Sequence, residues 1–488
     1  MCFPLISDNS GMITFVCCLV ALIAAYFLYG KFLDKLTGID PKAKMPSETM
    51  YDGVDYMPLP RWRIFLIQLL NIAGTGPIFG AILGACYGPV AFLWITIGGI
   101  LFGAMHDYMS GVISLRNDGK SLPEIIGKYL GGGMHKLTLV VIPLLMILVG
   151  AVFIVTPSQI LTDKTDIPYM VWVAIIIVYY FLATMLPVDK IIGKIYPVFG
   201  AALIFMAVSL FCVLIFGDYK IPELTDISNM HFNSQNLPIV PTLFISIACG
   251  AISGFHATQS PLMARCMTNE TQCRPIFFGA MITESIIALV WAAIAMAFFG
   301  GVEALNDYMQ ANGSNAGVAV SLICDTTLGR VGSILAILGV VIAPITSGDT
   351  AFRSARLIIA DMLHYDQKPI IKRLVVSIPL FVIGVAIAFM EFDVIWRYFA
   401  WSNQTLSVLT LWMITAWLMR KGSKYSFIAL VPAICMTYVC SSFFFVSGQF
   451  IGMGATPLAY AYGGAVTALI SGLLMLNIRR SIKNGATI

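Results

Sequence analysis

The chain has 488 residues, of which 59% are hydrophobic and only 11% are charged, and its mean hydropathy is +0.87. Soluble domains carry roughly 25% charged residues, so this composition excludes a soluble globular protein and predicts an all-α polytopic membrane protein. The formal net charge is +4, and because the basic residues fall mostly in alternate loops, the sequence indicates no nucleic-acid-binding surface.

Apolar stretches of about 18 to 25 residues are long enough to cross a lipid bilayer. Thirteen such stretches follow one another along the chain, near residues 12–33, 64–86, 89–115, 137–160, 168–187, 194–217, 238–260, 275–300, 330–351, 369–391, 393–419, 426–447 and 456–478. The first lacks a basic leader region and is too long for a signal peptide, so we expect it to be retained. Lysine and arginine crowd the loop that follows it and then every second loop, which predicts an external N-terminus and a cytoplasmic C-terminus.

The second stretch contains a predicted helix break at Asn71–Gly88, where Gly74, Gly76 and Pro77 stand in the middle of a span. Backbone that leaves the helix at membrane depth is tolerated only where protein or a cavity surrounds it. We therefore predict that Asn71, Thr75 and the amides near Gly74–Gly76 hold a substrate carboxylate. The alternative is that the glycines only allow close helix packing.

The third stretch carries His106 and Asp107 within the apolar run. A carboxylate in a span is costly and usually faces a cavity or a partner, so we predict a coupling role for Asp107 and, with it, His106. The alternative places both residues near the cytoplasmic end, beside Arg116. Neighbours on a helix point about 100° apart, so the two side chains need not pair.

A second predicted break lies at Cys249–Pro261, again with glycines inside and a proline at its end. Small or polar residues are dense there, and the predicted substrate-binding residues are Ser253, Gly254, His256 and Gln259. His256 can bind substrate or carry a proton near neutral pH, and the alternative is a structural hydrogen bond between helices.

Further polar groups stand in later spans. Glu284 is a mid-span carboxylate, and Thr346, Ser347 and Asp349 offer oxygen ligands for a proton relay or a sodium site, with sodium at Thr346 and Ser347. The alternative for Asp349 is an ion pair with Arg353 four residues later. Ser402 and Asn403 can line a pathway. Arg397 is expected at the outer edge, paired with Asp393 or, as the alternative, attracting an anionic substrate.

Two interrupted spans in corresponding halves point to a secondary transporter, with five helices counted from each break. An odd number of helices inverts the second copy, so the architecture resembles the leucine-transporter 5+5 inverted repeat. The expected divisions are residues 1–63 (first helix and cytoplasmic loop), 64–217 (first repeat), 218–237 (external loop), 238–419 (second repeat, with an external hairpin at 301–329) and 420–488 (two C-terminal helices and tail).

Enzymatic and cofactor signals are weak. The eleven cysteines show neither paired nor zinc spacing, and no zinc-protease, serine-hydrolase or P-loop motif occurs. Mid-span cysteines such as Cys249 are interpreted as ordinary small apolar residues. We therefore expect no cofactor and no enzyme activity, and a channel would not require two broken spans.

Several long strings of residues resemble the carbon starvation protein A family. They are NIAGTGPIFGAILG (71–84), HDYMSG (106–111), SLPEIIGKYLG (121–131), SGFHATQSPLMAR (253–265) and PITSGDTAFRSAR (344–356). The resemblance implies a bacterial inner-membrane transporter of the amino acid–polyamine–organocation group, active in carbon starvation. Its implied substrates are pyruvate, an amino acid or a short peptide.

We accordingly predict a cation-coupled symporter, with protons favoured slightly over sodium because several titratable groups lie in the spans. The alternative of another class is a membrane nutrient sensor that binds without transporting, and an intramembrane enzyme ranks third.

Overall fold

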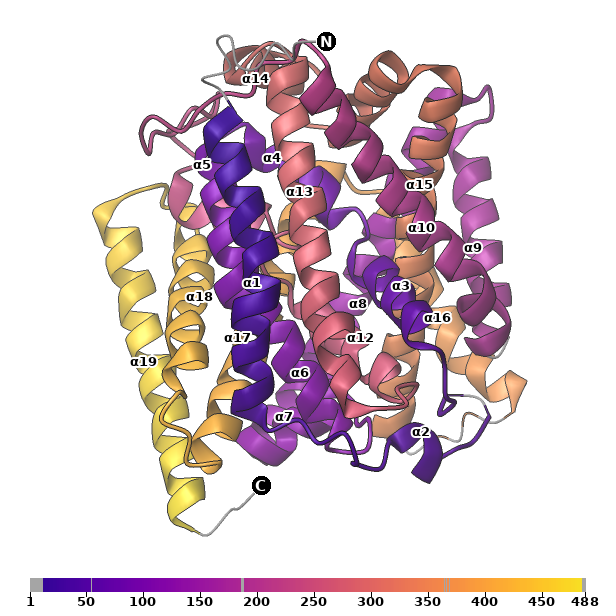
Figure 1. Cartoon of the computed structure of the whole chain (residues 1–488), viewed down its shortest axis with the longest axis vertical. Helices are drawn as coiled ribbons and strands as arrows, with labels where there is room; N and C mark the ends of the chain where they lie inside the picture. The colour runs from indigo at the N-terminus through magenta and orange to yellow at the C-terminus, as the bar shows by residue number, and fades with distance from the viewer. Residues whose placement is uncertain are drawn as a thin grey trace, which may run out of the picture.

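The computed structural model describes residues 12–53, 55–185, 188–363, 365, 367 and 369–484. The described residues form a bundle of helices without a strand, and most of the long helices run along one direction (Figure 1). Eight of these helices are long and apolar enough to cross a membrane, or nine if the bent pair at the first break is one span. The prediction of an all-α polytopic membrane protein is confirmed.

The helices of the first half of the chain are α1 (Ile13–Thr37), α2 (Pro46–Thr49), α3 (Arg61–Ile72), η2 (Gly76–Gly80), α4 (Ala81–Ala85), α5 (Val90–Leu93), η3 (Trp94–Ala104), α6 (Met105–Leu115), α7 (Leu122–Leu130), α8 (Gly132–Lys164), α9 (Tyr169–Met185) and α10 (Val188–Phe216). Those of the second half are η4 (Ile239–Leu243), α11 (Phe244–Ser246), α12 (Gly254–Ala264), η5 (Glu270–Gln272), η6 (Arg274–Phe278), α13 (Gly279–Phe298), α14 (Val302–Ala311), α15 (Ala316–Met362), α16 (Ile370–Ala388), α17 (Phe392–Arg420), α18 (Phe427–Val446) and α19 (Pro457–Lys483).

Each of the thirteen predicted stretches coincides with a helix or with a broken helix. The count of thirteen crossings stays a prediction, because some elements do not correspond one to one with spans. The predicted hairpin, for example, consists of α14 and the first part of α15, and the rest of α15, beyond a kink at Gly329 where φ is 63°, contains the predicted ninth span. The division into two inverted repeats also stays a prediction.

Burial separates central from peripheral helices. The apolar window of the span that contains α13 is 83% buried, whereas those of α1 and α19 are 28% and 22% buried. Apolar side chains on the outer helices, such as Leu28 and Leu469, are exposed and would contact lipid tails. The polar residues of the interior therefore depend on α13 and its neighbours for their partners.

The two ends of the bundle carry different loops. The helix α14 lies at the end where α1 begins, and α19 ends at the opposite end (Figure 1). At that opposite end, the Arg116 guanidinium pairs with Glu270 at 2.6 Å and donates to the carbonyl oxygens of Thr37 and Gly38, each at 2.9 Å. This arginine therefore joins the ends of α1 and α6 to η5.

Candidate functional site

The first predicted break is present. The helix α3 ends at Ala73, whose φ and ψ are −85° and 56°, and the chain resumes as η2 and α4 at an angle of 55° to α3. A side chain at Gly76 would place its Cβ 2.2 Å from the sulfur of Cys249. Glycine is therefore required at this position, because the two breaks are packed directly against each other.

The second break is also present, and two amide side chains of α17 hold its ends. The Nε2 of Gln404 donates to the carbonyl oxygens of Phe244 and Ala248, at 3.2 and 3.3 Å. The Oδ1 of Asn403 accepts from the backbone N–H of Phe255 at 2.8 Å, in the first turn of α12. Both side chains satisfy backbone groups that the interruption leaves without helical partners.

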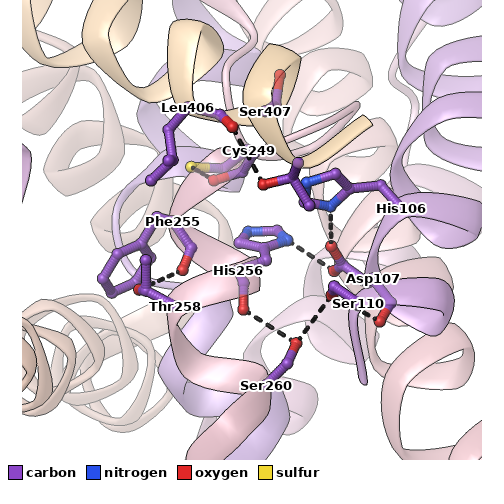
Figure 2. A network of polar contacts seen from close by, with 12 residues as sticks. His106, Asp107, Ser110, Cys249, Phe255, His256, Thr258, Ser260, Leu406 and Ser407 are labelled. Carbon is purple, nitrogen blue, oxygen red and sulfur yellow. Dashed lines mark hydrogen bonds and ion pairs between the residues drawn. The ribbon is translucent and has the colours of Figure 1, made fainter. Parts of the chain in front are cut away.

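A buried network connects α6, α12 and α13, and Figure 2 shows most of it. The Oδ1 of Asp107 lies 2.8 Å from Nδ1 of His106, and its Oδ2 lies 2.8 Å from Nδ1 of His256. On the other edge of the same ring, Nε2 of His256 lies 3.4 Å from the Oε2 of Glu284. All four side chains are 0% exposed. We call these four residues the Asp107 network.

The direction of these hydrogen bonds follows from the chemistry of the groups. A carboxylate only accepts hydrogen bonds, so both Nδ1 atoms that contact Asp107 carry hydrogen. In the neutral imidazole of His256 the Nε2 lone pair then faces Glu284. Neither oxygen of Glu284 has a hydrogen-bond partner, so the pair at 3.4 Å is an ion-pair distance without a directed hydrogen bond.

Two serine hydroxyl groups, one on α6 and one on α12, extend the network. Ser110 and Ser260 lie 3.2 Å apart, and Ser260 donates to the carbonyl oxygen of His256 at 3.2 Å (Figure 2). The sequence left open whether His106 and Asp107 pair, and the structure shows that they do.

Asp349 belongs to a separate cluster. Its Oδ2 accepts from the Tyr196 hydroxyl at 3.1 Å and lies 3.8 Å from Nη2 of Arg353. The ion pair that the sequence gave as the alternative for Asp349 is therefore present. Ser347 donates to the carbonyl oxygen of Leu70 near the first break at 3.0 Å, whereas Thr346 bonds to carbonyls of its own helix.

Several buried polar groups at the first break lack partners. The amide atoms of Asn71 and the hydroxyl of Thr75 are buried without a hydrogen bond, and so are both side-chain atoms of Gln68. Gln68 and Asn71 stand three positions apart in α3 and so share one face of that helix, whereas Thr75 lies beyond its end, directly before η2. Buried polar atoms in folded proteins are nearly always paired, so unpaired ones indicate a site for water or a ligand.

Other predicted site residues have structural partners. The Gly74 amide donates to the Ile72 carbonyl at 3.0 Å, and a Cβ on Gly254 would lie 2.4 Å from the backbone nitrogen of Ser407. Ser253 contacts Asn403, and Gln259 donates to Thr258 at 2.9 Å while its Oε1 is unpaired. Ser402 is half-buried on α17. The pairing of Arg397 with Asp393 involves a side chain outside the described residues.

A cavity of about 180 Å³ lies between the loop that precedes η4, the short helices η4 and α11, and the start of α17. His231, Trp396 and Arg397 are among its lining residues. The Nδ1 of His231 accepts from the backbone N–H of Asn233 at 3.0 Å. Burial, with the positive charge of Arg397 nearby, lowers the pKa of His231 to about 4.

Comparison with known proteins gives a family match across most of the chain. The family model described as carbon starvation protein CstA matches residues 10–170, 154–329 and 316–442. An uncharacterized membrane protein of Haemophilus influenzae is 43% identical over 352 residues, covering 62% of this chain and 95% of that protein.

Two named relatives are transporters. The peptide transporter CstA of Campylobacter jejuni is 24% identical over 579 residues, covering 89% of this chain and 80% of the relative. The pyruvate/proton symporter BtsT of Escherichia coli is 25% identical over 364 residues, which cover 62% of this chain and 50% of that protein. A variant of the manganese transporter of Eremococcus coleocola has the same fold, with a TM-score of 0.53, 13% identity, and coverage of 91% of this chain and 98% of that one. The named relatives are therefore transporters rather than enzymes.

Proposed function

The chain belongs to the carbon starvation protein CstA family, and on this premise we propose that it brings a small carboxylate nutrient into the bacterial cytoplasm together with protons. The substrate classes are pyruvate, an amino acid or a short peptide. The observation that carries the proposal is the set of unpaired polar groups of Asn71 and Thr75, buried where the first span is broken.

The substrate carboxylate would occupy the first break. The amide of Asn71 and the hydroxyl of Thr75 provide donors there, and no protein group occupies them. The Gly74 amide is already bonded to Ile72, so side-chain donors replace part of the role that the sequence gave to the backbone. Arg397, in the wall of the 180 Å³ cavity, places a positive charge where an anion would enter.

Protons would be carried by the Asp107 network. Its two carboxylates and two imidazoles lie in contact and are fully buried, so a change in the charge of one group changes the energy of the others. Gly76 packs on Cys249, whose sulfur lies within 4.8 Å of ligand atoms of His256 and Glu284, so the network adjoins the first break and proton binding can affect the substrate site. Sodium at Thr346 and Ser347 is the competing mode of coupling.

Counterflow and gradient-driven uptake in proteoliposomes test the proposal, using labelled pyruvate, amino acids and dipeptides at two pH values with and without sodium. We expect a pH gradient to drive accumulation of one of these substrates without sodium. A hydrogen bond to a charged group contributes about 1.5–3 kcal/mol, so Asn71→Ala should weaken substrate binding about 10- to 100-fold. The matched control is Asn236→Ala, which removes an exposed amide in the loop before η4.

Three results would each contradict part of the proposal. Binding without accumulation would support the sensor, and uptake that needs sodium and persists after the pH gradient collapses would assign coupling to sodium. Equal substrate affinity in Asn71→Ala and Asn236→Ala would remove the first break from the binding site.

A further inference from the structure

Three potential metal ligands converge where the two breaks meet. Cys249 lies in the second break, His256 in the first turn of α12, and Glu284 in the second turn of α13. The sulfur, the imidazole nitrogen and the carboxylate oxygen lie within 4.8 Å of one another, and all three residues are buried. They stand 7 and 28 positions apart in the chain, a spacing that matches none of the usual zinc motifs.

The imidazole of His256 is oriented as it is in metal sites. A metal-binding histidine commonly donates its other ring N–H to a carboxylate, which fixes the tautomer and aims the free lone pair at the metal. Here Nδ1 donates to Asp107 at 2.8 Å, and Asp107 is held in turn by His106. The Nε2 lone pair therefore faces Glu284, and it has no hydrogen-bond partner.

The other two ligands also carry features that favour a cation. Both oxygens of Glu284 are buried and have no hydrogen-bond partner. The amide of Asn403 donates toward the sulfur of Cys249 at 3.8 Å, so this sulfur already accepts a hydrogen bond from a polar group of α17. If His256 were the only partner of Glu284, the carboxylate oxygens would lack hydrogen bonds in an interior without water, which costs free energy.

The distance between the nitrogen and oxygen ligands suits a tetrahedral ion. Bond lengths of about 2.0–2.1 Å to nitrogen and oxygen and about 2.3 Å to sulfur place tetrahedral ligands about 3.3 Å apart for nitrogen and oxygen and about 3.6 Å apart for sulfur and nitrogen. The observed distance from Nε2 of His256 to Oε2 of Glu284 is 3.4 Å. Calcium and magnesium prefer all-oxygen sites, whereas zinc accepts this mixture of sulfur, nitrogen and oxygen.

We propose that Cys249, His256 and Glu284 form a binding site for a zinc-class divalent ion, with Asp107 as the residue that positions His256. Three protein ligands leave the fourth tetrahedral position for water or another small ligand. The site is distinct from the predicted sodium position at Thr346 and Ser347.

Occupation of this site would also affect uptake, an effect that rests on the proposed function. The ion would bind the Nε2 lone pair of His256, which faces Glu284, and so prevent a proton from passing between these two residues. It would also tie the second break to α13. Zinc should therefore inhibit proton-driven uptake.

Cobalt binding to the purified, chelator-treated protein tests the site without reference to transport. We expect one Co²⁺ per chain, with a thiolate-to-cobalt charge-transfer absorption in the near ultraviolet, displaced by Zn²⁺. Cys249→Ser should abolish that absorption. His256→Gln and Glu284→Gln should each weaken binding at least tenfold, and Asp107→Asn about 10- to 100-fold, with the charge-transfer absorption retained at saturating cobalt.

The matched control is Cys440→Ser, which changes a buried cysteine on α18 outside the cluster and should leave the absorption unchanged. Gel filtration and circular dichroism of each variant establish that it is folded. An absent charge-transfer absorption in the folded wild-type protein would overturn the proposal, and so would an absorption that persists in Cys249→Ser. A failure of pyruvate or peptide uptake would not alter the cobalt result, so the two proposals fail separately.

Discussion

Replacing Gly254 by alanine should destabilise the second break. The new Cβ would lie 2.4 Å from the backbone nitrogen of Ser407 and 2.5 Å from the carbonyl oxygen of Asn403, whereas ordinary contacts begin at 3.4 Å. The helices α12 and α17 would have to separate by about 1 Å, which would stretch the 2.8 Å bond from Phe255 to Asn403 beyond hydrogen-bonding range.

The magnitude follows from three opposing terms. Overpacking costs about 1–3 kcal/mol, and loss of a capping bond costs about 0.5–2 kcal/mol. The higher helix propensity of alanine returns at most about 1 kcal/mol. The steric terms are larger, so we expect a net destabilisation of about 0.5–4 kcal/mol in Gly254→Ala.

Unfolding in a titration with SDS, followed by tryptophan fluorescence, measures this change. The control is Gly472→Ala on α19, where an added Cβ meets nothing within 4 Å and stability should stay the same or rise slightly. If Gly254→Ala is as stable as Gly472→Ala, the close packing of α12 on α17 does not hold the break, and the reasoning is refuted.

Three further predictions concern charge. Asp107→Asn should reduce pH-driven uptake at least tenfold but reduce substrate exchange much less; uptake and exchange that both equal those of the wild type would retire the proton relay. Arg116→Met leaves the buried carboxylate of Glu270 with the backbone N–H of Asp40 as its remaining partner and should cost about 1.5–3 kcal/mol in the SDS titration, with part regained in the double variant that adds Glu270→Gln. Because burial lowers the pKa of His231 from 6.5 to about 4, the folded state binds this proton less readily than the unfolded state. Stability should therefore be full above pH 6.5 and fall by up to about 3 kcal/mol as the pH drops to 4, and His231→Gln should flatten that dependence.

Local sequence features predicted the helical class, the positions of the apolar stretches and both breaks. These features depend on residues close together in the chain: glycine and proline interrupt a helix wherever they stand in it. The break at Gly76 and the interruption before Gly254 are therefore visible in the sequence without any knowledge of their neighbours. The burial of Asp107, His256 and Glu284 was also predictable, because a titratable residue in an apolar run must turn away from lipid.

The sequence could not assign partners to those residues. Asp107 and His256 are 149 positions apart, and only the packing of α6 against α12 brings them to 2.8 Å. The same applies to Asn403, which was predicted to line a pathway and whose hydrogen bond with the backbone at the start of α12 depends on the packing of α17 against α12. The sequence identified the glycines at the breaks as points where the helix can be interrupted. It could not predict that Gly76 contacts Cys249, because this contact forms only when the two broken spans pack against each other.

By itself, then, the sequence determined that this chain crosses a membrane many times and that two of its spans come apart, because hydropathy and backbone freedom are properties of short segments. The tertiary structure decided which interior groups meet. It placed Asp107 between two imidazoles and set Cys249 and Glu284 around the free edge of His256, since residues so distant in the chain come together only when whole helices pack.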